Sequence, residues 1–181
     1  MAAVLALSST VATAADSSSS DSGWSSLQDG SVVLFRHANA PGGGDPQGFQ
    51  LGDCRTQRNL DEVGRAQARR IGEQFRRHGV KVGAVLTSQW CRARETAELA
   101  FPGMARDDTS FNSFFDDRSR EPAQTAQALA TLKRWRGPGV LVVTTHQGNI
   151  SALTGSGAAS GEGVVVRPTP TGVDVLGRLQ P

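Results

Sequence analysis

The chain has 181 residues, of which 38% are hydrophobic, and its 19 basic and 17 acidic side chains leave a formal net charge of +2. This length is enough to bury a sizeable core in a single domain. So small a net charge, without a basic stripe interleaved with aromatic residues, argues against a nucleic-acid partner.

The first 30 residues differ in composition from the rest of the chain. Residues 1–15 are small and apolar and contain an Ala-x-Ala cleavage pattern at 12–14, which predicts a signal peptide or part of one. The run is too short to cross a bilayer as a helix, so no transmembrane segment is expected. Residues 16–30 are rich in Ser and Asp and predict a linker to one domain at 31–181. These features favour export, to the periplasm of a Gram-negative cell; a disordered N-terminus on a cytosolic protein is the alternative.

From residue 31 onward, apolar runs alternate with segments of helical periodicity, as in α/β proteins. The runs carry Val and Leu without polar alternation, which is typical of strands buried on both faces of a parallel sheet. We therefore predict a three-layer α/β/α fold with a mostly parallel central sheet. The expected strands cover 31–36, 84–87, 140–144 and a closing pair at 163–167 and 172–176. The expected helices cover 62–78 with Asp61 as the N-cap, 91–100, 122–135, and a short segment after Gly148.

Two of the expected strands end in a histidine. Val32–Ala38 reads VVLFRHA, and Val140–Asn149 reads VLVVTTHQGN. Ligand sites of parallel sheets lie beyond the carboxyl ends of the strands. We therefore expect His37 and His146 to meet in one crevice, although they lie far apart in the sequence.

Arginines accompany both histidines in the expected crevice. Arg36 directly precedes His37, and Arg92 follows a third apolar run. Guanidinium groups bind phosphate through paired hydrogen bonds, and residues 55–106 hold eleven basic against five acidic side chains, a local excess that attracts anions. The pattern predicts a phosphoryl-binding site in which neutral His37 attacks phosphorus, His146 donates a hydrogen bond, and the arginines neutralise charge without a metal.

Four motifs in this order resemble those of the histidine phosphatase superfamily, the phosphoglycerate-mutase-like group, in its first branch. They are Arg36-His37-Ala38, Asn59–Ala68, Ser88–Ala97 and Thr145-His146-Gln147-Gly148. The resemblance implies a phosphoglycerate-mutase-like fold and hydrolysis of a phosphate monoester through a phosphohistidine on His37. It assigns phosphate binding to Arg36, Arg92 and His146, and it implies no cofactor.

Three further polar residues are expected to help to bind phosphate. Backbone N–H groups near Gln147 lie at an expected helix N-terminus, which favours an anion, and Asn39 and Gln57 are candidates for additional hydrogen bonds. One neighbour departs from the family pattern, since Ala38 replaces the glycine that usually follows the histidine.

A second departure from the family pattern concerns the acid that protonates the leaving group. Ser113 stands where the family often has a glutamate. We expect Asp116 to take this role, with Asp117 or Glu162 as alternatives.

Cys54 and Cys91 are the only cysteines, and in an oxidising compartment they would be able to pair. Two free thiols are the alternative. Zinc held by these thiols with His37 and His146 is disfavoured, because the sequence has no C-x-x-C or H-x-x-x-H spacing. The leader and the cysteines together resemble exported envelope members of the superfamily, some of which act on sugar phosphates of the lipopolysaccharide core. The expected substrate is accordingly a phosphorylated small molecule or an envelope sugar phosphate.

Two other functions compete with this interpretation. A phosphoprotein phosphatase would be favoured by an open, shallow pocket. A non-catalytic phosphate-binding module would be favoured by Ala38 and by the displaced acid. Mutase activity is less expected, because the chain is short and lacks the family's glutamate. The sequence does not indicate an oligomeric state.

Overall fold

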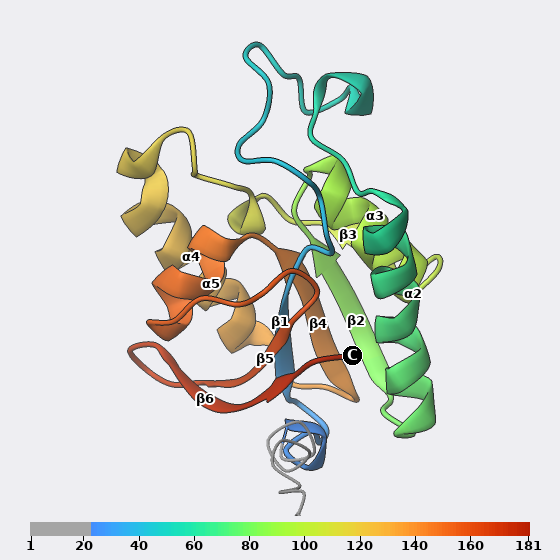
Figure 1. Ribbon diagram of the computed structural model, residues 1–181. Coiled ribbons are helices and arrows are strands. Elements are labelled where there is room, and N and C mark those ends of the chain that lie inside the picture. The colour runs from blue at the N-terminus through green and yellow to red at the C-terminus, as the bar shows by residue number, and fades with distance from the viewer. Residues whose placement is uncertain (1–22) are drawn as a thin grey trace, which may run out of the picture.

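The computed structural model describes residues 23–181 (Figure 1). The expected signal peptide and the first part of the expected linker lie outside the described residues. The linker ends earlier than its composition predicts, because Trp24 lies in a helical turn that packs on the domain. Its ring contacts Phe75 and stacks on His78, with centroids 5.2 and 4.3 Å apart. The folded domain therefore includes residues 23–30.

The strands within the described residues form one central sheet. They are β1 (Val32–Arg36), β2 (Val82–Thr87), β3 (Ala105–Asp107), β4 (Val140–Thr145), β5 (Gly163–Pro168) and β6 (Val173–Leu179). Their order is β3-β2-β4-β1-β5-β6. The first four of this order are parallel to one another, whereas β5 and β6 are antiparallel to their neighbours. The mostly parallel sheet predicted from the sequence is confirmed.

β3 is the strand that the sequence did not predict. It lies at the edge of the sheet, and two of its three residues are charged. A strand this short, without an apolar run, leaves no periodicity to detect. The other strands overlap their expected ranges, and β2 begins two residues earlier than expected.

Within residues 23–181, four α-helices cover the sheet. They are α2 (Glu62–Arg77), α3 (Cys91–Ala100), α4 (Glu121–Arg134) and α5 (Gln147–Thr154), and short 3₁₀ turns η1 (Cys54–Thr56), η2 (Thr109–Phe111) and η3 (Arg118–Arg120) lie between them. The Asp61 carboxylate accepts a 2.7 Å hydrogen bond from the Gly64 N–H, which confirms the predicted N-cap of α2. α2 and α3 lie on one side of the sheet, and α4 and α5 on the other (Figure 1).

A separate hydrophobic core fills each side of the sheet. Side chains of β1 alternate between the two cores: Phe35 packs with Phe75 and the α2–α3 layer, whereas Leu34 packs with Leu132 and Ile150 in the α4–α5 layer. All six residues of β4 are buried, as expected for a central strand covered on both faces. The three-layer α/β/α architecture predicted from the sequence is thereby confirmed.

The segment between β1 and α2 passes over the carboxyl ends of the parallel strands (Figure 1). We call residues 38–58 the strap. A disulfide between Cys54 and Cys91, whose Cα atoms are 5.7 Å apart, ties it to the first residue of α3, so the predicted pairing is confirmed. None of the helices in the described part of the chain is long and apolar enough to cross a membrane.

Candidate active site

The two predicted histidines meet at the carboxyl ends of adjacent parallel strands. β1 pairs with β4 so that Arg36 lies opposite Thr145, and each strand is followed directly by its histidine. The His37 N–H donates to the Thr145 carbonyl at 2.9 Å, and the two imidazole centroids are 5.5 Å apart. Strand register alone therefore brings His37 and His146 into one site.

His37 is held as a neutral ring with one nitrogen available for chemistry. Its Nδ1 lies 2.8 Å from the Ala38 carbonyl, and because a carbonyl only accepts, Nδ1 carries the proton and Nε2 the lone pair. Burial, reinforced by Arg92 and two other arginines, lowers the pKa of His37 to about 3, although the bond to Ala38 acts in the opposite direction. The ring is therefore unprotonated at neutral pH.

His146 is also buried and neutral. Its pKa lies well below the ordinary value, first because of burial and then because of Arg92. Nε2 lies 2.8 Å from the Ser88 hydroxyl, whose oxygen also accepts a hydrogen bond from the Trp90 N–H. Two acceptors lie within reach of the single Ser88 O–H, Nε2 of His146 at 2.8 Å and Asn112 Oδ1 at 3.4 Å, and the shorter contact assigns the proton to Nε2. In this arrangement Nδ1 of His146 carries the ring proton and is a donor for an anion.

Three arginines, not two, surround the histidines. Arg36 and Arg92 were predicted, and Arg58 from the strap is added by the structure. Burial, followed by repulsion from Arg92, lowers the pKa of both Arg36 and Arg58, as expected of cations gathered in one place. Among residues 23–181, the Nε–H groups of Arg36 and Arg92 are buried without a hydrogen-bond partner. Orphaned cationic donors of this kind favour an anionic ligand.

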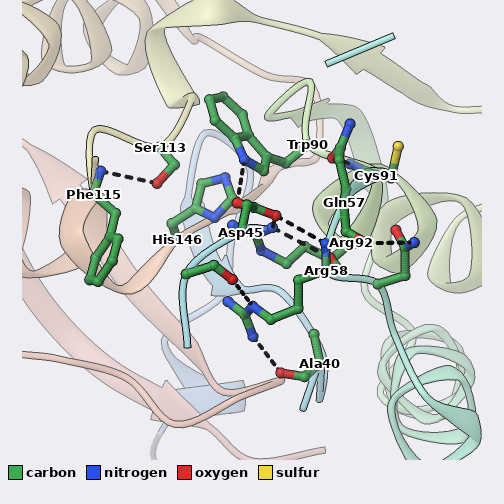
Figure 2. A network of polar contacts seen from close by, with 12 residues as sticks. Ala40, Asp45, Gln57, Arg58, Trp90, Cys91, Arg92, Ser113, Phe115 and His146 are labelled. Carbon is green, nitrogen blue, oxygen red and sulfur yellow. Dashed lines mark hydrogen bonds and ion pairs between the residues drawn. The ribbon is translucent and has the colours of Figure 1, made fainter. Parts of the chain in front are cut away.

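Asp45 is the residue that sequence reasoning missed most completely. Its carboxylate accepts a 2.8 Å hydrogen bond from Arg92 Nη1, and both side chains are only 3% exposed. The carboxylate accepts two further hydrogen bonds, from Trp90 Nε1 at 2.9 Å and from the Arg58 backbone N–H at 3.1 Å. Figure 2 shows Asp45 between the Trp90 indole and the Arg92 guanidinium, next to His146. Only the folded strap brings this carboxylate to the site.

These residues line a cavity of about 440 Å³, a size that accommodates a small-molecule ligand. Its base contains the two histidines and Arg36 and Arg92. Its walls come from the strap and from the segment before α4, and they include Gly42, Gly43, Gly44, Asp45, Arg58, Ser113, Phe114, Phe115 and Arg118. Phe115 is an aromatic side chain at this wall, and it is 67% exposed. The cavity therefore extends well beyond the space needed for a phosphoryl group.

The three additional phosphate ligands have different locations. Gln147 lines the cavity, and its Oε1 accepts from Arg36 Nη1 at 3.3 Å, so that it orients this arginine. The Gln57 amide is instead committed to the backbone of Gln50, Leu51 and Cys91, which holds the strap in place. Asn39 donates to the N-cap carboxylate of α2. Neither Gln57 nor Asn39 belongs to the described lining of the cavity.

The three acid candidates lie outside the lining of the cavity. Asp117 caps η3 through the Ser119 N–H at 3.1 Å. Glu162 accepts from Arg178 and from the Ala159 N–H, both at 2.7 Å. Asp116, like these two, is not among the described lining residues, so the structure brings none of the three to the reacting groups.

Ala38 fits the site in place of the family's glycine. Its N–H donates to Thr96 Oγ1 at 3.0 Å, its carbonyl binds His37, and its side chain is fully buried in a small cluster with Ala40, Leu60 and Ala68. The added methyl group therefore packs against apolar neighbours. Within residues 23–181, no group of three or more His, Cys, Asp and Glu side chains is arranged to hold a metal ion.

The fold and the site together define a phosphoglycerate-mutase-like α/β protein with a cationic, two-histidine cavity. Residues 32–108 match the family model of the histidine phosphatase superfamily (branch 1), which confirms the resemblance indicated by the motifs. No curated protein sequence gives a significant match.

Several experimentally determined structures share this fold. The protein histidine phosphatase SixA complexed with tungstate is 15% identical, with a TM-score of 0.60 over 83% of this chain and 96% of that one. A putative alpha-ribazole-5'-P phosphatase from Escherichia coli is 14% identical, with a TM-score of 0.59 over 80% and 93%. Phosphoglycerate mutase from Thermus thermophilus is 19% identical, with a TM-score of 0.58 over 82% and 98%. At these identities the likeness establishes the fold.

Proposed function

We propose that this protein hydrolyses a phosphate monoester through a phosphohistidine on His37, without a metal ion. The observation that carries the proposal is the state of His37. Its Nδ1 is held by the Ala38 carbonyl and its pKa is about 3, because of burial and neighbouring arginines, so Nε2 is a free nucleophile at neutral pH. This nucleophile lies in a cavity built for an anion.

The charges of the cavity match those of the substrate group. Arg36, Arg58 and Arg92, less the carboxylate of Asp45, leave an excess of two positive charges. A phosphate monoester is a dianion above its second pKa of about 6. The orphaned Nε–H groups of Arg36 and Arg92 supply donors for its oxygens, and the N–H of His146 and the first turn of α5 add further donors.

The reaction proceeds in two displacements. His37 Nε2 attacks phosphorus in line while the bond to the ester oxygen breaks, and the electron pair leaves with that oxygen. Water then attacks the phosphorus of the phosphohistidine, the phosphorus–nitrogen bond breaks, and its electron pair returns to Nε2. The arginines neutralise the equatorial oxygens throughout, which is the part that a metal plays in other phosphoryl-transfer sites.

The walls of the cavity favour a small-molecule ester over a phosphoprotein. The strap and the segment around Phe115 both line the cavity of about 440 Å³ that contains His37, so the phosphoryl site lies in a cavity rather than on a flat surface. The exposed ring of Phe115 is suited to stack against a sugar. An envelope sugar phosphate therefore remains our preferred substrate class.

The disulfide supports an oxidising location for the protein. Cys54–Cys91 ties the strap to the helix that carries Arg92, so it belongs to the active fold. We accordingly propose that the protein is exported, to the periplasm if the cell is Gram-negative. Detection of the mature protein in an osmotic-shock fraction tests this placement.

The direct test of the function is hydrolysis of 4-nitrophenyl phosphate in the presence of EDTA. We expect turnover by the wild type, no turnover by His37→Ala, and a phosphoryl adduct on wild-type protein in neutral-pH mass spectrometry. His78→Ala is the matched control, because His78 stacks on Trp24 at the C-cap of α2 and is not among the residues that line the cavity. Phosphate binding without turnover by folded wild type would favour the non-catalytic module.

A further inference from the structure

Asp45 has a buried carboxylate that lines the cavity. Neither of the two displacements described above uses this carboxylate. The other carboxylate among the described lining residues, Glu121, is ion-paired with Arg118 at 3.1 Å and is partly exposed. The Asp45 side chain by contrast is 3% exposed and is bonded directly to Arg92. A buried acid in contact with the principal phosphate ligand is a candidate for handling protons.

The strap places Asp45 in the wall of the cavity rather than at its base. Gly42 and Gly44 adopt left-handed φ angles of 92° and 70°, a conformation that favours glycine, and they turn the chain so that the next side chain points to Arg92. In-line attack by His37 directs the ester oxygen away from the base of the cavity, toward its walls. Of the two carboxylates that line the cavity, Glu121 is paired with Arg118, whereas the partner of Asp45, Arg92, is itself a phosphate ligand.

We propose that Asp45 carries the proton of the reaction, as the acid that protonates the leaving oxygen and the base that deprotonates the attacking water. This inference rests on the proposed function of the same site. It assigns to the strap the role that Asp116 was expected to fill from a different segment.

The charged groups around Asp45 explain how it acquires a proton. Without substrate it contacts Arg92 from α3 and the backbone of Arg58 from the strap, and Arg36, His37 and His146 line the same cavity. Burial alone would raise the pKa of Asp45, but the hydrogen bonds from Arg92, the Arg58 N–H and Trp90 hold it below the ordinary value. A phosphoryl dianion bound to Arg92 competes for the guanidinium donors and brings a like charge close to Asp45, and both effects raise the pKa of Asp45. Substrate binding therefore favours uptake of a proton by Asp45.

The proton balance of the two steps is then complete. In the first, the Asp45 carboxyl group gives its proton to the ester oxygen, the alcohol departs, and Asp45 becomes a carboxylate. In the second, water attacks phosphorus and its proton passes to Asp45, which restores the acid. Inorganic phosphate leaves, and Asp45 returns its proton to solvent and re-forms its bond to Arg92.

The decisive experiment compares wild type with Asp45→Asn on phenyl phosphate and 4-nitrophenyl phosphate. The two substrates are similar in shape but differ in their leaving groups. Phenolate is a poor leaving group and needs a proton from an acid, whereas 4-nitrophenolate leaves readily without one. We expect Asp45→Asn to lower kcat/KM for phenyl phosphate relative to 4-nitrophenyl phosphate by roughly 10²-fold or more. Asp45→Glu should restore part of this ratio. An equal change on both substrates would overturn the proposal and leave Asp45 as a counter-ion of Arg92.

A second measurement does not depend on the stability of a variant. Calorimetry of sulfate binding to wild type in buffers of different ionisation enthalpy counts the protons taken up, because sulfate itself carries none at neutral pH. We expect net proton uptake on binding, whereas binding without uptake would contradict the proposal. If His37→Ala keeps its turnover, the proposed function fails; if only the substrate ratio is unchanged in Asp45→Asn, the function stands and the role of Asp45 fails.

Discussion

At the scale of single residues, the site depends on arginines that the fold buries before any ligand arrives. Arg92 is 3% exposed, its Nη1 is paired with Asp45, and its Nε–H has no described partner. Burying a guanidinium group costs free energy unless the charge is paired, and one carboxylate does not offset three arginines. The negative charge on the equatorial phosphoryl oxygens completes the pairing, so Arg92 acts in catalysis more than in folding.

We expect Arg92→Ala to lower kcat/KM by about 10²–10³-fold while the protein stays folded, because a positioned charge donor is lost from the transition state. Arg92→Lys should recover only part of the activity, since an ammonium group lacks the planar pair of donors. Arg94→Ala is the matched control, because Arg94 is half-exposed and pairs with Asp107 at the edge of the sheet. Steady-state kinetics of the three variants, with circular dichroism as the check of folding, decide the matter. Near-normal turnover by folded Arg92→Ala would remove Arg92 from the site.

At the scale of elements, the strap is the part of the structure that completes the cavity. It contributes Arg58 and Asp45, and it is fastened to α3 by Cys54–Cys91 and by the bond from the Cys91 N–H to Gln57 Oε1 at 3.0 Å. Arg92 is the next residue of α3. The fastening therefore fixes the distance between the strap and the principal phosphate ligand.

We expect the double substitution of Cys54 and Cys91 by serine to destabilise the protein and to lower its activity. The disulfide closes a loop with a sequence separation of 37, and the chain-entropy model gives a loss of at most about 4 kcal/mol of unfolding free energy. Because the strap carries Asp45, kcat/KM should fall at a temperature where the variant is fully folded. Urea unfolding and kinetics on the same preparation measure the two effects. An unchanged kcat/KM would show that the strap holds its position without the disulfide.

At the scale of the whole molecule, two buried neutral histidines couple stability to pH. In the unfolded chain a histidine titrates near 6.5. In the fold, burial and then neighbouring arginines lower the pKa of His37 to about 3 and that of His146 well below its ordinary value. Between the folded and unfolded pKa values the unfolded chain binds more protons. The contribution of these histidines to the free energy of unfolding is therefore greatest above pH 6.5, and it falls as the pH decreases toward 3.

We expect His37 to cost about 2 kcal/mol of unfolding free energy between about pH 7 and about pH 5, and His146 to act in the same direction. The His37→Gln variant should accordingly lose less stability over this interval than wild type, by about the contribution of one histidine. Comparing the two proteins at each pH separates this effect from carboxylates whose pKa is lowered, such as Asp45 and Asp61. Equal pH dependence in urea unfolding of both proteins would mean that His37 titrates normally in the fold.

The amino-acid sequence by itself determined the class of fold and the base of the site. Uninterrupted Val and Leu runs predict buried parallel strands, and the residues after such strands meet at one edge of the sheet, so Arg36, His37 and His146 were identifiable without a structure. Arg92 was identifiable because it opens a helix directly after another such strand. These inferences work because strand and helix periods are properties of local sequence.

The tertiary structure decided the walls of the cavity and the choice of acid. Arg58 and Asp45 lie on the strap, where no period relates one side chain to the next, and Asp116, expected as the acid, lies outside the lining. Where an irregular segment places its side chains depends on long-range ties, here the disulfide and the bonds of Gln57. These long-range contacts form only after the segments that they join have come together in the fold, so the periodicity of the sequence does not predict them.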